Sequence, residues 1–159
     1  MPDVTPLRTH EPADCTPDLD EIAREGARRM LVQALESEVA DYIDRNQERD
    51  ERGRAQVVRN GTARARKVTL GSGTVEVRAP RVDDRREHDD GNRRRFRSHI
   101  LPPYMRRSPK VAEVLPILYL RGLSTGDFKE GLAALLGDDA AGLSPTAITR
   151  LTAAWQADY

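Results

Sequence analysis

The sequence has little of several features that define other classes of protein. It contains one cysteine, Cys15, so no disulfide can form within the chain. No apolar run approaches the roughly 20 residues of a membrane-spanning helix, and no signal-peptide core is present. Aromatic residues make up only 4% of the chain, too few for the stacking platforms that bind single-stranded nucleic acid. We therefore expect a cytoplasmic protein with no membrane partner, and any nucleic acid that it binds should be double-stranded.

Catalytic and metal-binding motifs are also missing. His10, His88 and His99 have no metal-ligand spacing with Cys15, and the sequence has no Gly-rich phosphate loop or nucleophile motif. The acidic residues within 83–90 lie among arginines and lack the fixed spacing and rigid support of a metal site, which favours a solvated loop. The sequence therefore predicts no catalytic residue and no metal ligand in this chain.

What the sequence does contain is a strong charge asymmetry beneath a net charge of zero. Residues 1–44 have a net charge of −7, residues 45–110 of +10 and residues 111–159 of −3. A basic middle segment between acidic flanks predicts a polyanion-binding surface. A solvated exterior with many ion pairs is the alternative, and charge alone does not decide between the two.

The first two segments differ in their apolar pattern. Residues 1–17 contain four prolines and no apolar period, which predicts a disordered leader. Residues 18–46 carry apolar side chains at three- and four-residue steps, including Ile22, Met30 and Leu35, which predicts a long amphipathic helix. Because heptads are not sustained, we expect this helix to pack on its own domain; the alternative is a helix that pairs with another copy of this chain.

Residues 47–100 are predicted to form a basic β-hairpin region and a loop. After a polar connector the period changes to two, with a turn expected at Asn60-Gly61 and a hairpin pairing residues 66–70 with Val75 and Val77 across 71–73. Pro80 should end the second strand or confine it to an edge. Residues 83–99 are almost entirely polar, which predicts a mobile loop. Basic residues on the strands and this loop can contact a DNA backbone or groove, or can simply keep one strand face solvated.

Residues 101–159 are expected to form a helical bundle. Ser108-Pro109 begins a helix that runs to Gly122, with a kink or break at Pro116, and Ser124 or Thr125 begins a second helix that ends at Gly137. Ser144-Pro145 begins the third, whose inner face carries Ile148, Leu151 and Trp155. The last two helices form a helix-turn-helix candidate with Thr146, Thr149 and Arg150 exposed to DNA bases and phosphates. An ordinary helical hairpin is the alternative, because the loop at 138–143 is long.

An ordered set of motifs extends these predictions. VVRNG (57–61), GTVEVRAPRV (73–82), FRSHILPPY (96–104), LYLRGLSTGDF (118–128) and LSPTAITRLTAAW (143–155) resemble the N-terminal half of the Mutator-type insertion-sequence transposases. The resemblance implies a region that binds the element's terminal inverted repeats. In that family it precedes a ribonuclease H-like domain whose Asp-Asp-Glu triad holds Mg²⁺ or Mn²⁺. Because the sequence ends at Tyr159, before that triad, we expect a truncated transposase with no cofactor of its own.

Together these patterns predict an α+β fold: a long N-terminal helix, a small basic antiparallel hairpin or sheet, and a C-terminal bundle with a helix-turn-helix-like pair. The predicted function is sequence-specific binding of the inverted repeats in duplex DNA by a nucleoid-associated protein. The alternative is an interaction module that binds and inhibits full-length transposase without contacting DNA. The candidate DNA-binding residues are Thr146, Thr149, Arg150, Arg64, Arg66, Lys67, Arg93, Arg94, Arg95 and Arg97.

Overall fold

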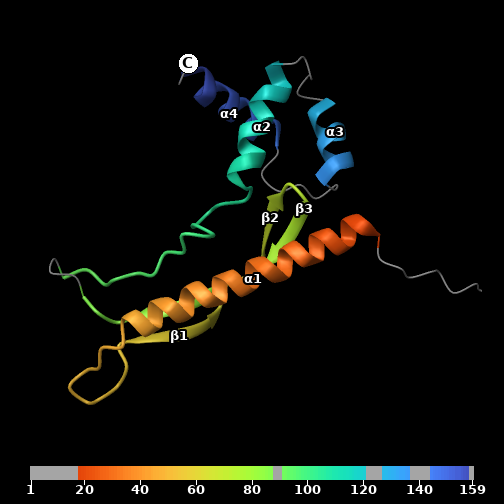
Figure 1. The fold of residues 1–159 in the computed structure, drawn as a ribbon. Helices are drawn as coiled ribbons and strands as arrows, with labels where there is room; N and C mark the ends of the chain where they lie inside the picture. Colours follow the sequence, from red (N-terminus) through yellow and green to blue (C-terminus); the bar gives the residue numbers. More distant parts are fainter. Residues whose placement is uncertain (1–17, 88–90, 121–126, 137–143, 158–159) are drawn as a thin grey trace, which may run out of the picture.

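The computed structural model describes residues 18–87, 91–120, 127–136 and 144–157. The predictions for residues 1–17, for Gly122, for Ser124 and Thr125, and for 137–143 concern residues outside these ranges. The predicted inward position of the Trp155 side chain also lies outside what the structure describes. The α+β class is confirmed, and Figure 1 shows a long helix, two strand pairs and a separate group of helices. The elements are α1 (Leu19–Arg45), β1 (Val57–Thr62), β2 (Arg66–Leu70), β3 (Gly73–Val77), β4 (Pro80–Asp84), α2 (Pro109–Leu120), α3 (Asp127–Leu136) and α4 (Pro145–Ala157).

Helix α1 forms the spine of the α/β part. Its N-terminus is capped by Asp18, whose carboxylate accepts the Asp20 N–H at 2.9 Å. Leu35 and Val39 are buried, whereas Ile22 and Met30 are 54% and 67% exposed. The helix is therefore packed along only part of the apolar stripe expected from its sequence.

The four strands form one interrupted antiparallel ribbon, residues 57–84, that lies against α1 (Figure 1). β2 pairs with β3 as the predicted hairpin, with Val68 opposite Val75, but the turn is Gly71-Ser72 alone because Gly73 already pairs with Leu70. β1 pairs with β4, and the Ala63 N–H donates to the Ala79 carbonyl at 2.8 Å between the two pairs. The ladder of hydrogen bonds is thus continued across the break between the pairs.

Two sequence signals have different roles from those expected. The turn predicted at Asn60-Gly61 is wrong: both residues lie inside β1, at an irregularity of the pairing with β4. Gly61 has φ +62°, a conformation that a β-bulge requires as readily as a hairpin turn does. Pro80 lies beyond the end of β3 and is the first residue of β4, a position that tolerates the missing N–H.

The prediction of a mobile loop over residues 83–99 is wrong for the first of these residues, which are built into the fold. Asp84 and Arg86 are only 5% and 6% exposed. The Arg86 guanidinium donates to both Asp84 carboxylate oxygens, at 2.9 and 2.8 Å, and the Tyr42 hydroxyl donates to Asp84 Oδ2 at 2.6 Å. Further along, the Phe96 ring packs on Tyr42 with centroids 4.9 Å apart. A paired charge, rather than apolar burial, orders this polar segment.

Two separate hydrophobic clusters stabilise the protein. One joins α1 to the ribbon and consists of Leu35, Val68, Val75, Val77 and Leu101. The other joins α2, α3 and α4 and consists of Val111, Leu115, Leu132, Leu136 and Ile148. The ribbon and the bundle therefore have their own cores.

The C-terminal bundle begins where the sequence predicts. Ser108 Oγ accepts the Val111 N–H at 3.4 Å at the start of α2, and Ser144 Oγ accepts the Ala147 N–H at 3.2 Å at the start of α4. α2 continues through the buried Pro116 without a break. α4 packs chiefly on α2. The helix-turn-helix pairing of α3 with α4 stays a prediction, since the residues joining them lie outside the described ranges.

A short parallel contact connects the two parts. The Thr69 N–H in β2 donates to the Arg106 carbonyl, and the Ser108 N–H donates to the Thr69 carbonyl, both at 2.9 Å. Residues 106–108 thus extend the edge of the ribbon directly into the start of α2. This connection places the first residues of the bundle beside the ribbon.

Candidate nucleic-acid interface

The break in the ribbon is the centre of the first basic hollow, which we call the ribbon groove. It has a volume of about 320 Å³. Both strands leave regular pairing here, between Thr62 and Arg66 on one side and between Val77 and Pro80 on the other. The segment 96–103 closes a further side. The residues lining the groove are Ala63, Arg64, Arg66, Ala79, Pro80, Arg81, Val82, Phe96, Arg97, Ser98, Leu101 and Pro103.

The ribbon groove therefore brings together arginines from three parts of the sequence. Arg64 and Arg66 come from the β1–β2 connection and β2, Arg81 from β4, and Arg97 from the segment after the buried Asp84–Arg86 pair. Arg64, Arg81 and Arg97 are exposed. Three of the four are predicted DNA-binding residues.

Arg66 differs from the other three because it forms part of the groove wall. Its guanidinium donates to the Leu101 carbonyl at 3.0 Å and to the Pro102 carbonyl at 3.2 Å. The pKa of Arg66 is lowered, first by burial and second by the nearby positive charge of Arg106. Arg66 thus contributes charge while it also holds residues 101–102 against β2.

A second basic hollow, the bundle groove, lies between the chain leading into α2 and the first half of α4. It has a volume of about 510 Å³. The pKa of Arg107 is lowered by burial and by the charge of Arg150, so these two cations lie close enough to repel each other. The lining residues are Pro102, Pro103, Tyr104, Met105, Arg106, Arg107, Pro109, Ala112, Ala147 and Arg150.

The two grooves adjoin each other and share one sign of charge. Pro103 lines both, and the Arg66–Arg106 repulsion crosses from one to the other. Among the residues that the structure describes, no carboxylate lines either groove. Positive charge that is not balanced locally produces a strong positive potential, which attracts polyanions.

Other arginines of the same basic segment are neutralised. Arg59 pairs with Glu36 at 2.6 Å, Arg85 with Asp83 at 2.9 Å, and Arg86 with Asp84 at 2.8 Å. Ion pairs thus neutralise some arginines of residues 45–110, whereas Arg64, Arg81 and Arg97 line the ribbon groove, to which no described carboxylate contributes.

The predicted residues of α4 are exposed, as the helix-turn-helix prediction requires. Thr146, Thr149 and Arg150 all face solvent, while Ile148 is buried and Leu151 partly buried. Arg150 and Ala147 line the bundle groove, whereas the two threonines lie outside its described lining. The tip of α4 thus lies beside the basic surface.

The remaining predicted residues are more distant from the grooves. Lys67 is exposed on β2 and lies opposite Glu76 in the ladder. Arg93 and Arg95 are exposed, and Arg94 is half-buried with its Nε enclosed and without a hydrogen-bond partner. None of these four residues is in the described lining of either groove.

Sequence reasoning missed two of the groove residues, Arg106 and Arg107. Their signal was a basic pair placed directly before the Ser108-Pro109 helix start, where a fold must bring them beside the first turn of α2. Arg81 was not among the candidate residues either. Because it stands next to Pro80 at the break in the ribbon, its side chain lies in the groove.

The described residues do not offer a site for a divalent ion. No group of three or more His, Cys, Asp or Glu side chains gathers among them. The most buried carboxylate, Asp84, has its oxygens occupied by Arg86 and Tyr42. In the same part of the chain, no helix has both the length and the apolar content needed to cross a bilayer.

Comparison with known proteins agrees with the motif pattern. A family model described as "Transposase, Mutator family" matches residues 5–158. Over 46 residues the chain is 59% identical to a protein of Mycolicibacterium smegmatis named "Transposase for insertion sequence element IS6120". The matched segment is 29% of this chain and 14% of that relative, so the comparison covers a small part of the longer protein.

Proposed function

The chain belongs to the Mutator family of transposases, and from that premise we propose that its two grooves bind duplex DNA at the terminal inverted repeats of an insertion sequence. The observation that carries the proposal is that seven arginines, and no described carboxylate, line the adjoining grooves. The guanidinium group can form bidentate hydrogen bonds with phosphate oxygens, and it stays charged at any physiological pH. The grooves would therefore hold the DNA backbone.

Sequence recognition would come from α4. Its first turns carry the exposed Thr146, Thr149 and Arg150, and Arg150 also lines the bundle groove. A helix fits the major groove of B-DNA, where arginine can bond the O6 and N7 atoms of guanine and threonine can contact a thymine methyl group or a phosphate. Contacts between the groove arginines and the DNA phosphates would fix the position of α4 on the duplex, and these side chains would contact the bases from that position.

Binding to element-end DNA against scrambled DNA of equal length tests the proposal. We expect the element ends to bind more tightly. Replacement of Arg150 by alanine should reduce the preference by about 1–3 kcal/mol. Replacement of Arg97 should weaken both duplexes alike and flatten the dependence of log K on log salt by about one unit. Equal binding of the two duplexes by the unaltered protein would refute specific recognition, and equal behaviour of the two variants would refute the division of roles.

A second candidate function is association with another transposase chain. The observation that favours it is the exposure of large apolar side chains on α1, with Leu19, Ile22 and Met30 all more than half exposed. Such an association would inhibit the partner transposase by covering the surface through which that transposase pairs with other copies. It would need no DNA contact. Co-purification with a full-length family member, lost when Ile22 and Met30 are replaced by serine, would support it. If the chain did not bind the full-length family member, this candidate function would be refuted.

A further inference from the structure

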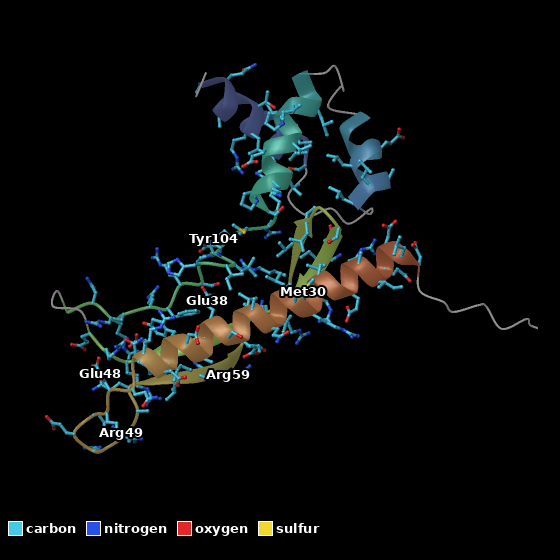
Figure 2. The ribbon with its side chains drawn as sticks, viewed as in Figure 1. Met30, Glu38, Glu48, Arg49, Arg59 and Tyr104 are labelled. Atoms are coloured by element: carbon cyan, nitrogen blue, oxygen red, sulfur yellow. The ribbon has the colours of Figure 1, made fainter. Side chains whose placement is uncertain are left out.

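A carboxylate on α1 anchors the segment that separates the two grooves. The Ser98 hydroxyl donates to Glu38 Oε2 at 2.5 Å, and the His99 N–H donates to Glu38 Oε1 at 2.6 Å. The Ile100 N–H lies 3.4 Å from the same oxygen. Figure 2 shows Glu38 between α1 and the chain that runs to Tyr104, with Arg59 on the opposite side of the helix. The groups that Glu38 contacts are thus neutral donors of one short segment rather than a basic side chain.

The same segment is held at its other end by Arg66. The Leu101 N–H donates to Ser98 Oγ at 2.9 Å, and the Leu101 and Pro102 carbonyls accept from Arg66. Leu101 itself is buried in the core between α1 and the ribbon. Residues 98–102, which we call the anchored segment, are therefore fixed by a carboxylate from α1 and a guanidinium from β2.

The position of the anchored segment matters because groove residues flank it. Arg97 precedes it and lines the ribbon groove, while Pro103 follows it and lines both grooves. A phosphate contact depends on holding the guanidinium at a defined place, since a freely moving side chain loses conformational entropy when it binds. The segment has no regular secondary structure to hold it, so its position depends on these side-chain bonds and on the burial of Leu101.

We propose that Glu38 is a positioning residue for DNA binding, which keeps Arg97 and the wall between the two grooves in place without touching DNA itself. The proposal rests on the proposed function of the grooves. It predicts that removal of this negative charge, although it lies close to a DNA-binding surface, should lower the affinity for DNA. Long-range electrostatics alone gives the opposite expectation, because a carboxylate repels phosphates.

Glu36 offers a matched control. It lies two residues away on the same helix and pairs with Arg59 at 2.6 Å. Figure 2 shows Arg59 across the helix from Glu38. Glu36→Gln and Glu38→Gln change the net charge equally. Binding of both variants and of the unaltered chain is measured by fluorescence anisotropy with a labelled duplex of random sequence, over a series of salt concentrations. Hydrogen exchange of the amides at 98–101 is followed in the same proteins without DNA.

For Glu38→Gln we expect about a tenfold rise in Kd, a salt dependence flatter by about one unit, and faster exchange of the His99 and Ile100 amides. Glu36→Gln should bind as tightly as the unaltered chain or more tightly, with unchanged exchange at 98–101. Glu38→Asp, which restores a carboxylate, should recover part of the affinity. A role limited to overall stability would lower the unfolding temperature of Glu38→Gln but leave the salt dependence of the folded protein as it was.

The outcomes separate this inference from the proposed function. If Glu38→Gln binds the duplex as Glu36→Gln does, the inference is overturned while the grooves keep their proposed role. If the unaltered chain binds no duplex, the proposed function fails, and unchanged exchange at 98–101 in Glu38→Gln would overturn the anchoring role as well. Should Glu38→Gln fail to fold, Ser98→Ala replaces it: it removes the hydroxyl that bonds Glu38 and the Leu101 N–H without any change of charge. It should raise Kd about threefold, and an unchanged Kd would contradict the proposal.

Discussion

Arginines at the two regions of the β ribbon are placed in opposite surroundings. At the β1–β4 end, Arg86 is buried and its guanidinium is shared among Asp84, Asn46 and Glu48. At the break in the ribbon, Arg64 and Arg81 line a groove that no described carboxylate enters. Both kinds of residue belong to the same basic stretch of sequence. The comparison shows that the charge of a segment does not indicate its role, which is determined by where the fold places the carboxylates.

The physical reason lies in the cost of burying a charge. A buried guanidinium must be matched by acceptors, and Arg86 donates to five acceptor atoms, so its charge serves to hold β4 to α1. An exposed arginine has no such need, because water solvates it. Its charge remains available to phosphate. On the proposed function, the first region therefore serves stability while the second serves binding. Each prediction below either tests this division or measures its extent.

The largest effect is expected from Arg86→Ala. The substitution leaves the Asp84 carboxylate buried without its main partner, which should cost about 3 kcal/mol of unfolding free energy. Urea denaturation followed by circular dichroism measures it. Arg85→Ala is the matched control, since its neighbouring ion pair with Asp83 is about half exposed and should contribute less than about 1 kcal/mol. Equal losses in the two variants would contradict the structural role assigned to Arg86.

The buried pair of Asp84 and Arg86 should also make the free energy of unfolding depend on pH. The Arg86 guanidinium is the main cause that lowers the pKa of Asp84 to about 2, from an ordinary 3.8, with the Tyr42 hydroxyl adding to the shift. Because the folded pKa is depressed, the stabilisation is complete above about pH 4 and is lost as the pH falls toward 2. Its size is about 2 kcal/mol. Asp84→Asn has no carboxyl at this position, so its denaturation midpoint should depend less steeply on pH over that window. An equally steep dependence would exclude Asp84 as the cause.

Substitution of a groove arginine should change the affinity for DNA much more than the stability. For Arg81→Ala we expect a change in unfolding free energy within about 0.5 kcal/mol. Its Kd for any duplex should rise about tenfold, with the salt dependence flatter by about one unit. Arg59→Ala removes an equal charge from the same ribbon, but from an ion pair with Glu36, and should change Kd much less. If Arg59→Ala weakened binding as strongly as Arg81→Ala, net charge rather than the groove would explain the affinity.

The smallest effect concerns the Arg59–Glu36 pair itself. Both side chains are substantially exposed, so a double-mutant cycle should give a coupling of about 0.2–1 kcal/mol that disappears in high salt. The control is the same cycle for Arg86 and Asp84, whose larger coupling should persist in salt because the pair is buried. A salt-independent Arg59–Glu36 coupling would contradict the ranking of the two regions.

Local patterns predicted the regular elements well where the chain is apolar or strongly punctuated. The hairpin of β2 and β3 and the helix starts at Ser108 and Ser144 follow from alternation and capping, which act over a few residues. The errors at Asn60-Gly61 and at residues 83–86 have one cause. A glycine that accepts positive φ suits a turn or a bulge equally, and a charged pair becomes a stable core only when another element supplies its partners. Neither choice can be made from neighbouring residues alone.

The sequence by itself determined the α+β class, the hairpin, the capped helices and the concentration of positive charge in residues 45–110, because each depends on local periodicity, capping or composition. Only the tertiary structure decided that Arg64, Arg81 and Arg97 share one groove, that Arg106, Arg107 and Arg150 share the next, and that Arg86 is buried in an ion pair. Electrostatic interactions act through space and vary with burial, whereas sequence order records neither. For that reason the available charge of this protein became visible only in three dimensions.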